Sequence, residues 1–298
     1  MSLRHNIKQR YLRFTEFKWI VGVAEFDSGL VLDPRKKPRI HWIKSDVKGS
    51  WFADPFILSE TGDHINLLVE EYEYAKRKAR ISKLVVNRHD WNLEQIVPVI
   101  EIPTHLSFPA YYRENGKVYI YPESTKSGKL TLYEYDEESG RTTPVREISD
   151  CPLADATLWN SDGKQYILAT TAPKDNGKVL DFYPVTDTPS KSPESQYSFK
   201  SYTARNAGLP FDIEGRTIRP AQDCTGRYGS CVVLQEVKRD NGRIRFEEVK
   251  RLYSPLLRYN LAFHTFNVFE NRLVAVDAQG FRNGWPAQIA YYFRELFR

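Results

Sequence analysis

The 298-residue sequence has no apolar run longer than a β-strand, so no segment is long enough to cross a bilayer as a helix. Its opening residues, MSLRHNIKQRYLRF, carry charge but no apolar stretch that could form the core of a signal peptide. The sequence therefore predicts a cytoplasmic protein without a transmembrane segment.

Cysteine is also scarce, and Cys151, Cys224 and Cys231 form neither a CxxC pair nor a Cys/His set with metal-ligand spacing. We expect free, mostly buried thiols in a reducing compartment. Positive charge is spread along the chain, since the net charge is +5 and only residues 35–37 and 76–80 form dense basic runs. A nucleic-acid-binding protein more often gathers such charge in one stripe, so no nucleic-acid partner is predicted.

Aromatic residues are abundant instead. They make up 13% of the chain, with 18 Tyr, 16 Phe and 6 Trp against a single Met. Aromatic side chains favour pleated strands over helices. The overall content of 41% hydrophobic and 27% charged residues is typical of a folded, soluble protein. The composition therefore predicts a mainly β structure.

One pattern repeats five times along the chain: a short polar motif, a strand-like run, a turn rich in Gly, Asn and Asp, and a second strand-like run. The five segments are residues 51–72, 107–124, 155–171, 218–237 and 264–279. Their turns supply residues that accept positive φ, as tight hairpins require. One or two further alternating runs follow each of the first four segments. Each unit is therefore predicted to be a four-stranded meander, which is the architecture of a propeller blade.

The fifth unit ends after two strands, and strand-like runs at 19–26 and 40–43 can complete it. Such closure would remove an exposed sheet edge. We predict an all-β fold, a five-bladed β-propeller whose ring is closed by N-terminal strands. The alternative is an open β-sandwich pair whose hairpins resemble each other by accident. The prediction is one domain, residues 1–298, with blades at about 51–103, 107–150, 155–204, 217–256 and 264–280 plus 19–43.

A short C-terminal helix is predicted from Pro286, because Ile289, Phe293, Leu296 and Phe297 recur at helical spacing after a proline in the first turn. We expect this apolar face to dock on the propeller. The alternative is that the Arg-bearing tail lies on a lipid surface.

The innermost strand of every blade begins near the propeller axis, so the polar motifs that open the repeats should converge at one face. The converging residues are Asp54, Ser107, Asp155, Arg219 with Gln222, and His264. Burying such groups is costly unless they bind each other, water or a ligand. A polar ligand pocket is therefore predicted, with a water-filled polar plug as the alternative.

The segment WFADPFI at 51–57 resembles the first-blade motif of the five-bladed propeller glycosidases, the arabinanase, xylosidase and invertase-like enzymes. The ordered series FADPF, SFP with PES, DATLW, RPAQDC with YG, and HTFN is similar to another group, from about residue 19 to the C-terminus. That group is the propeller domain preceding the glycosyltransferase in plant glucosamine inositolphosphorylceramide transferases, together with bacterial relatives associated with surface-polysaccharide synthesis. The resemblance implies a carbohydrate or sugar-conjugate ligand and a glycosyltransferase partner.

By the same resemblance, Asp54 matches the glycosidase base, and His264 matches an axial histidine that in some members approaches a bound cation or its water. No cofactor is otherwise expected. The chain departs from the hydrolase pattern, with Asp155 where a catalytic Glu is usual and Ser107 where an Asp is usual. Glu123 and Glu71 are the nearest replacement acids.

Glycoside hydrolysis needs two carboxylates, about 6.5 to 9.5 Å apart for inversion and about 5 to 5.5 Å apart for retention. The candidate catalytic residues are Asp54 as base, with Glu123 or Asp155 as an acid whose pKa burial raises. Arg219 would hold a ligand carboxylate or phosphate, or else form a salt bridge to Asp54 or Asp155. The aromatic residues Trp51, Tyr111, Tyr112 and Trp159 would stack on sugar rings or pack between blades.

Two functions remain open. The first is a glycosidase-like enzyme, an inverting hydrolase or a related activity on an acidic or nucleotide-linked sugar. The alternative is a non-catalytic carbohydrate-binding or scaffold propeller that works with a glycosyltransferase on another chain. Two suitably spaced carboxylates at the axis would favour chemistry, and one beside Arg219 would favour binding.

Overall fold

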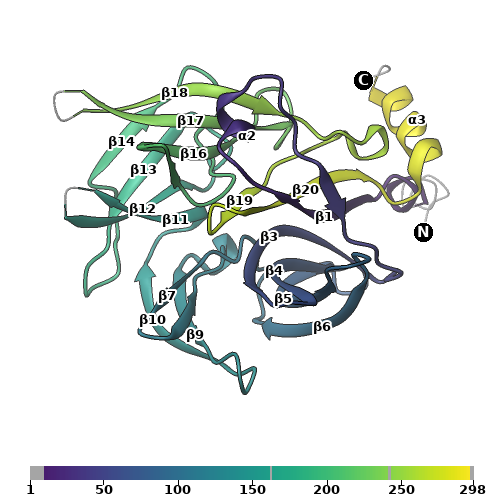
Figure 1. Cartoon of the computed structure of the whole chain (residues 1–298), viewed down its shortest axis with the longest axis horizontal. Coiled ribbons are helices and arrows are strands. Elements are labelled where there is room, and N and C mark those ends of the chain that lie inside the picture. The colour runs from purple at the N-terminus through teal and green to yellow at the C-terminus, as the bar shows by residue number, and fades with distance from the viewer. Residues whose placement is uncertain (1–9, 162, 241–242, 296–298) are drawn as a thin grey trace, which may run out of the picture.

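A computed structural model of the chain describes residues 10–161, 163–240 and 243–295. Five four-stranded antiparallel sheets are arranged around a ring, each one a blade (Figure 1). The first four blades are β3 (Ser50–Glu60), β4 (His64–Glu73), β5 (Lys78–Asn87), β6 (Leu93–Ile100); β7 (Tyr111–Glu114), β8 (Lys117–Ile120), β9 (Leu130–Tyr135), β10 (Thr142–Ser149); β11 (Leu153–Ser161), β12 (Lys164–Thr171), β13 (Val179–Pro184), β14 (Ser195–Ser198); and β15 (Phe211–Ile213), β16 (Arg216–Asp223), β17 (Cys231–Asp240), β18 (Arg243–Leu252).

The fifth blade joins the two ends of the chain. Its strand order is β19 (Phe266–Phe269), β20 (Leu273–Phe281), β1 (Phe17–Glu25) and β2 (Ile40–Trp42). β1 pairs with β20 without interruption, from Phe17 opposite Phe281 to Glu25 opposite Leu273. The predicted five-bladed propeller closed by N-terminal strands is confirmed, because this pairing covers what would otherwise be an open sheet edge.

Short turns of positive φ connect the inner strands of the blades. Asn115 and Gly116, with φ of 51° and 75°, link β7 to β8, and Glu214 and Gly215, with φ of 46° and 74°, link β15 to β16. Two consecutive residues of positive φ suit the twist of a two-residue hairpin. The turn ENGK at 114–117 lies within the hairpin predicted for residues 107–124, but the turn at 214–215 was not predicted.

The fourth blade therefore begins earlier than the sequence indicated. Its innermost strand is β15, only three residues long, whereas the expected start was residue 217. Three residues are too few for an alternating pattern to be recognisable. The consequence is that Arg219 and Gln222 lie on β16, the second strand of the blade.

The apolar core lies between the faces of neighbouring blades. Phe56 of the first blade meets Phe108, before β7, edge to face at 5.1 Å between ring centroids. Val21 of β1 belongs to the same buried cluster as Ile65 and Leu67 of β4, which joins the fifth blade to the first. Of the three free thiols, Cys151 and Cys231 are buried and Cys224 is half-buried.

Helices are few. α2 (Gly29–Leu32), the 3-10 turns η1 (Thr125–Ser127) and η2 (Leu257–Tyr259), a helical stretch at residues 10–14, and α3 (Gly284–Glu295) are described. The C-terminal helix is confirmed. Within the described part of the chain, no helix has the length and apolar character needed to span a membrane.

The expected docking face of α3 is wrong. Ala287 is buried and Tyr291 packs on Phe281 at 5.3 Å, whereas Ile289 and Phe293 are 66% and 63% exposed. Leu296 and Phe297 lie outside the described residues. A small residue at 287 lets the helix approach β20 closely, so the larger apolar side chains face outward.

Candidate functional site

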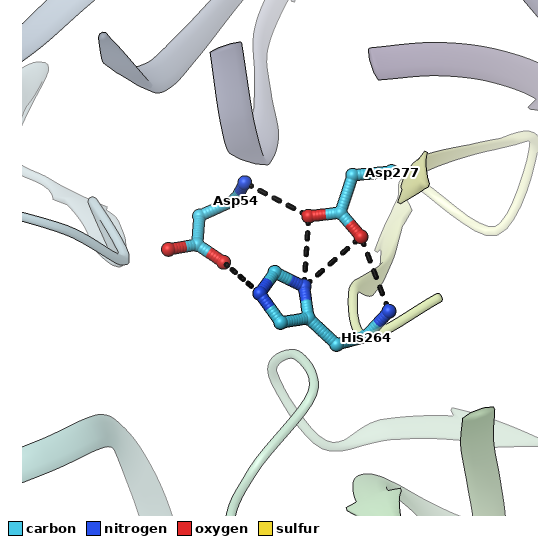
Figure 2. Close-up of side chains that lie close together, drawn as sticks. All are labelled: Asp54, His264 and Asp277. Atoms are coloured by element: carbon cyan, nitrogen blue, oxygen red, sulfur yellow. Dashed lines mark hydrogen bonds and ion pairs between the residues drawn. The ribbon is translucent and has the colours of Figure 1, made fainter. Parts of the chain in front are cut away.

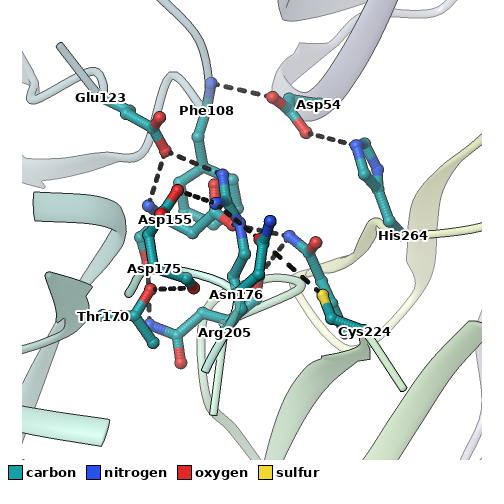
Figure 3. A network of polar contacts seen from close by, with 12 residues as sticks. Asp54, Phe108, Glu123, Asp155, Thr170, Asp175, Asn176, Arg205, Cys224 and His264 are labelled. Carbon is teal, nitrogen blue, oxygen red and sulfur yellow. Dashed lines mark hydrogen bonds and ion pairs between the residues drawn. The ribbon is translucent and has the colours of Figure 1, made fainter. Parts of the chain in front are cut away.

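Polar groups from all five blades gather on the propeller axis (Figure 3). Asp54, Phe108 and Asp155 occupy equivalent places at the starts of the first three blades, with positive φ of 50°, 44° and 45°. In β3 and β11 the residue sits in a β-bulge, where pairing with the next strand shifts register. A bulge redirects the local backbone. It thereby aims a backbone N–H across the gap between blades.

Each of these three N–H groups donates to a carboxylate from a preceding blade. The Asp54 N–H donates to Asp277 Oδ2 at 3.1 Å, and the Phe108 N–H donates to Asp54 Oδ2 at 3.0 Å. The Asp155 N–H donates to Glu123 Oε2 at 2.9 Å. Carboxylates and backbone amides thus form a relay that links the fifth blade to the first, the first to the second, and the second to the third.

Asp54, His264 and Asp277 form one buried cluster (Figure 2). His264 Nδ1 lies 2.9 Å from Asp277 Oδ2, and His264 Nε2 lies 3.8 Å from Asp54 Oδ1. The backbone N–H groups of His264 and Thr265 both donate to Asp277 Oδ1 at 3.1 Å. Trp19 stacks on the imidazole with 4.0 Å between ring centroids. The predicted closeness of Asp54 and His264 on the axis is therefore observed.

Burial and charge act together on this cluster. Burial raises the pKa of Asp54 to about 7, although the positive charge of His264 opposes the change. Burial alone would lower the pKa of His264, but Asp277 and then Asp54 outweigh it and raise that pKa to about 9. Burial would also raise the pKa of Asp277, but His264 holds it below its ordinary value. At neutral pH the cluster therefore contains an Asp277–His264 ion pair. The protonated and the ionised forms of Asp54 are both populated at this pH.

These three residues are also the candidates for holding a cation, since one ligand atom from each lies within 4.8 Å of the others. A histidine must be neutral to bind a metal. The raised pKa of His264 opposes metal binding, whereas the engagement of its Nδ1 by Asp277 leaves Nε2 available, as in many metal-ligating histidines. The cation or water expected near His264 therefore stays a prediction.

Arg205 holds a second group of acids beside the first (Figure 3). Its Nε donates to Asp155 Oδ2 at 2.5 Å, and its Nη2 lies 3.3 Å from Glu123 Oε2. Its Nη1 donates to Asp175 Oδ2 at 2.9 Å. Burial raises the pKa of Asp155, and the Arg205 charge opposes that rise. One guanidinium thus pairs with both acids that the sequence nominated as proton donors.

The role predicted for Arg219 is wrong. Arg219 is fully buried and meets neither Asp54 nor Asp155. Its Nε donates to Asn206 Oδ1 at 2.8 Å, and its Nη1 donates to Gln235 Oε1 at 2.7 Å. Burial lowers its pKa to about 9. Because alternate residues of a strand face opposite sides, Arg219 points between blades while Gln222, an odd number of residues away, faces the axis.

Gln222 donates through Nε2 to Asp155 Oδ2 at 2.6 Å and to the Asn206 carbonyl at 2.8 Å. Its Oε1 is buried and has no hydrogen-bond partner in the described structure. An unsatisfied buried acceptor is costly, so a donor from water or a ligand would stabilise it. Gln222 therefore stays a candidate ligand-contacting residue.

The sequence offered Glu71 as an acid for the axial site, but the structure places its carboxylate away from the axis. Its Oε2 accepts from Arg80 Nε at 3.0 Å and from Ser82 Oγ at 2.7 Å, both on the neighbouring strand β5. The adjacent Glu70 points the other way, pairs with His105 at 3.0 Å, and helps to raise the pKa of Asp54. The pleat of β4 decides which of the two acids faces the site.

Ser107 is buried, and its backbone pairs with Glu123. Phe108, not Ser107, is the residue equivalent to Asp54. Tyr111 donates through its hydroxyl to the Ile57 carbonyl at 2.5 Å, and Tyr112 stacks on Tyr119 at 5.2 Å. Both tyrosines therefore serve packing between or within blades.

Trp159 is not placed to stack on an axial ligand. It lies near the far end of β11 and packs on Phe182 at 6.0 Å, with the Arg239 guanidinium 5.6 Å from its ring centroid. It belongs to the core between the third and fourth blades. Trp159 lies too far along β11 from Asp155 to contact a ligand on the axis, since a strand advances about 3.3 Å per residue.

Trp51 borders a separate cavity of about 530 Å³, within the size range of small-molecule sites. We call this cavity the aromatic groove. Trp51 stacks on Tyr72 with 4.7 Å between ring centroids and an interplanar angle of 10°. Trp19 lies 6.5 Å from Trp51 and connects the groove wall to His264. The groove is lined by Tyr11, Leu12, Thr15, Glu16, Phe17, Trp51, Tyr72, Tyr74, Tyr291 and Arg294.

The loop at residues 224–230, between β16 and β17, covers the axial cluster. The Tyr228 ring meets His264 edge-on at 5.4 Å, and the Arg205 guanidinium lies 5.2 Å from the same ring. Gly229 has φ of +58°, and a Cβ built there would lie 2.7 Å from His264 Cβ. The loop therefore depends on glycine at this position, and Tyr228 separates the buried ions from solvent.

Four important residues were missed from the sequence: Arg205, Asp277, Tyr228 and Glu70. Asp277 had a usable signal, because a single acid within the apolar run LVAVDA is unusual unless it has a buried partner. Arg205 lies in the segment TARNAG, which precedes β15 as the other polar motifs precede their blades. Tyr228 and Glu70 had no comparable signal.

The fold and its axial cluster define a five-bladed β-propeller. Solved structures with this fold include a GH43_1 enzyme from Xanthomonas citri, with TM-score 0.53 and 11% identity over 79% of this chain and 88% of that one. The RS223 beta-xylosidase is similar, with TM-score 0.54 and 10% identity over 78% of this chain and 92% of that one. At such identities the similarity extends to the fold alone.

Residues 40–258 match the family described as glucosamine inositolphosphorylceramide transferase 1, N-terminal, and the chain belongs to this family. The Arabidopsis thaliana protein of that name is 25% identical over 75% of this chain and 32% of its own length. The Oryza sativa subsp. japonica protein is 27% identical over 64% of this chain and 26% of its own length. The resemblance found in the sequence is confirmed, and the chain spans about a quarter to a third of these relatives.

Proposed function

We propose that this chain is a carbohydrate-binding propeller that recognises a sugar or sugar conjugate during glycan or glycolipid assembly, without hydrolysing it. A glycosyltransferase is the proposed partner. The proposal is supported by the family, whose curated relatives are named as transferases and are matched over only part of their length. The cytoplasmic location expected from the sequence stays a prediction.

The engagement of the axial acids by Arg205 is the observation that carries the non-hydrolytic part of the proposal. A hydrolase needs one carboxyl free to protonate the leaving group and another facing the attacked carbon or a water. Asp155 and Glu123 both bind Arg205, and Glu123 also accepts the Asp155 N–H. Both acids are thus occupied by partners within the protein, as in a structural network.

The aromatic groove supplies the sugar-binding surface of this proposal. Trp51 and Tyr72 present a stacked pair of rings, and the apolar face of a sugar packs well on such surfaces. Glu16, Thr15 and Arg294 add polar groups that can orient hydroxyls or an anionic substituent. A few polar groups on an apolar wall are typical of small-ligand sites.

Titration calorimetry with neutral hexoses, amino sugars, uronic acids and inositol phosphate tests the proposal. Trp51→Ala should weaken binding of whichever probe binds by about fivefold or more, because one stacked aromatic ring contributes about 1 kcal/mol beyond its buried area. Trp91→Ala is the matched control, since Trp91 stacks on His41 outside the groove. Equal loss in both variants, or no binding by any probe, would refute the groove as the sugar site.

A glycoside hydrolase with Asp54 as base is the second candidate. The pKa of Asp54, raised to about 7, favours it, because an efficient general base has a pKa near the working pH. The test is turnover of a panel of aryl glycosides by the unmodified chain and by Asp54→Asn. Hydrolysis that Asp54→Asn abolishes would establish this candidate and overturn the non-hydrolytic proposal.

A further inference from the structure

One edge of the propeller exposes a cluster of large apolar side chains. Trp285, Ile289, Tyr292 and Phe293 are exposed along one side of α3, at the spacing of one helical face. Leu12, Phe14 and Phe17 are exposed in the N-terminal segment. Single exposed apolar residues are ordinary, but a contiguous group marks an interaction surface.

The two segments form one surface. The Tyr11 hydroxyl donates to the Ala290 carbonyl at 3.3 Å, and Asn283 Nδ2 donates to the Phe14 carbonyl at 2.8 Å. The Arg294 guanidinium lies 4.8 Å from the Tyr11 ring centroid. Figure 1 shows α3 and the segment from residue 10 to β1 side by side at the edge of the ring, next to β20. We call this surface the terminal face.

The terminal face is bordered by positive charge. Residues 10–18 and 282–295 contain five Arg or Lys residues against two acids, Glu16 and Glu295. Glu16 is already paired with Arg282 at 2.8 Å. The exposed Arg227 adds a further charge, with its Nη1 3.4 Å from the Tyr292 hydroxyl. An apolar helix face with arginines beside it is the pattern of helices that lie in a membrane interface.

We propose that the terminal face docks the propeller onto a bilayer that contains anionic lipids. Trp285 and Ile289 enter the boundary between headgroups and acyl chains, and the arginines meet lipid phosphates. A second copy of the chain fits this surface poorly, because a two-fold contact would place arginines against arginines with few acids to balance them.

Docking would also orient the aromatic groove. Tyr11, Leu12, Phe17 and Arg294 line the groove and belong to the terminal face. A docked propeller therefore holds the groove at headgroup level, where a lipid-linked sugar can enter it. This consequence rests on the proposed sugar binding, whereas the docking itself does not.

Vesicle co-sedimentation of the full chain tests the docking, with phosphatidylcholine vesicles and with vesicles containing phosphatidylserine. No sugar or glycolipid is present, so failure of sugar binding leaves this test intact. The chain should bind the phosphatidylserine vesicles and be released by raised salt. Ile289→Asp should weaken binding about tenfold or more, since it replaces inserted apolar area with charge. Val145→Asp is the matched control, because Val145 is exposed on β10 in the second blade.

Tryptophan fluorescence gives a second readout that does not depend on the folding of a charged variant. Trp285 emission should shift to the blue on vesicle addition, and Trp285→Phe should remove that shift. No binding to either vesicle, equal losses in Ile289→Asp and Val145→Asp, or a vesicle-free dimer that Ile289→Asp dissociates would each overturn the proposal.

Discussion

Replacing Asp54 with Asn should flatten the pH dependence of stability near neutrality. Burial raises the pKa of Asp54 to about 7 in the folded chain, against an ordinary value of 3.8. Between these values the unfolded chain has lost the proton and the folded chain retains it, so the free energy of unfolding falls as pH rises. The fall ends above the folded pKa, and its full extent is about 4 kcal/mol. Between pH 5.5 and 7.5 it should amount to about 2 kcal/mol.

Asparagine suits this test because its amide oxygen can still accept the Phe108 N–H. Asp277 stays beside His264 in the variant, so the stabilisation by the protonated imidazole, complete below pH 6.5 and lost through about pH 9, is largely common to both chains. Urea unfolding at pH 5.5, 6.5 and 7.5 gives the free energies. The unmodified chain should lose about 2 kcal/mol more than Asp54→Asn across this range.

Asp277→Asn provides the matched control, since the pKa of Asp277 is lowered in the folded chain and its charge is stabilising above pH 4. It should destabilise the chain at all three pH values because it removes the partner of His264. Parallel pH profiles for the unmodified chain and Asp54→Asn would refute the assignment of a raised pKa to Asp54.

Two further substitutions test the network around the axis. Arg205→Met should cost about 3 to 5 kcal/mol in urea unfolding at neutral pH because it leaves buried carboxylates unpaired, whereas Arg113→Met, at a partly exposed pair with Glu137, should cost under about 1 kcal/mol. A similar cost for both would contradict the network. Gly229→Ala should lower the melting temperature more than Gly226→Ala, since both have positive φ but only a Cβ at 229 meets His264; equal shifts would show that the loop yields.

The sequence was sufficient for the architecture because the relevant patterns are local. Alternating runs and turns such as ENGK define hairpins, and the incomplete fifth unit required strands from the other end of the chain. β15 was not predicted because three residues are too few to show an alternating pattern. The exposed face of α3 was not predicted because helical spacing shows which residues share a face but not which face packs on the protein.

Side-chain direction was the main source of error at the site. Glu70 and Glu71 are neighbours in the sequence, yet one faces the axis and the other binds Arg80. Arg219 and Gln222 diverge in the same way on β16. The face that a strand residue occupies depends on pairing register and bulges, and a shift of one residue reverses it. Neither property is readable from residue types alone.

The relay of carboxylates gives the polar residues at the starts of the blades a structural role. Asp54, Phe108 and Asp155 differ in side chain but share a positive φ and an N–H that donates to an acid of a preceding blade. Phe108 can stand in this series because the feature common to all three places is the backbone donor. A buried N–H needs an acceptor, and a carboxylate gives a stronger bond than a neutral one. The acids that resemble a catalytic set thus also link neighbouring blades, and the proposed non-hydrolytic function assigns ligand recognition to the surfaces around them.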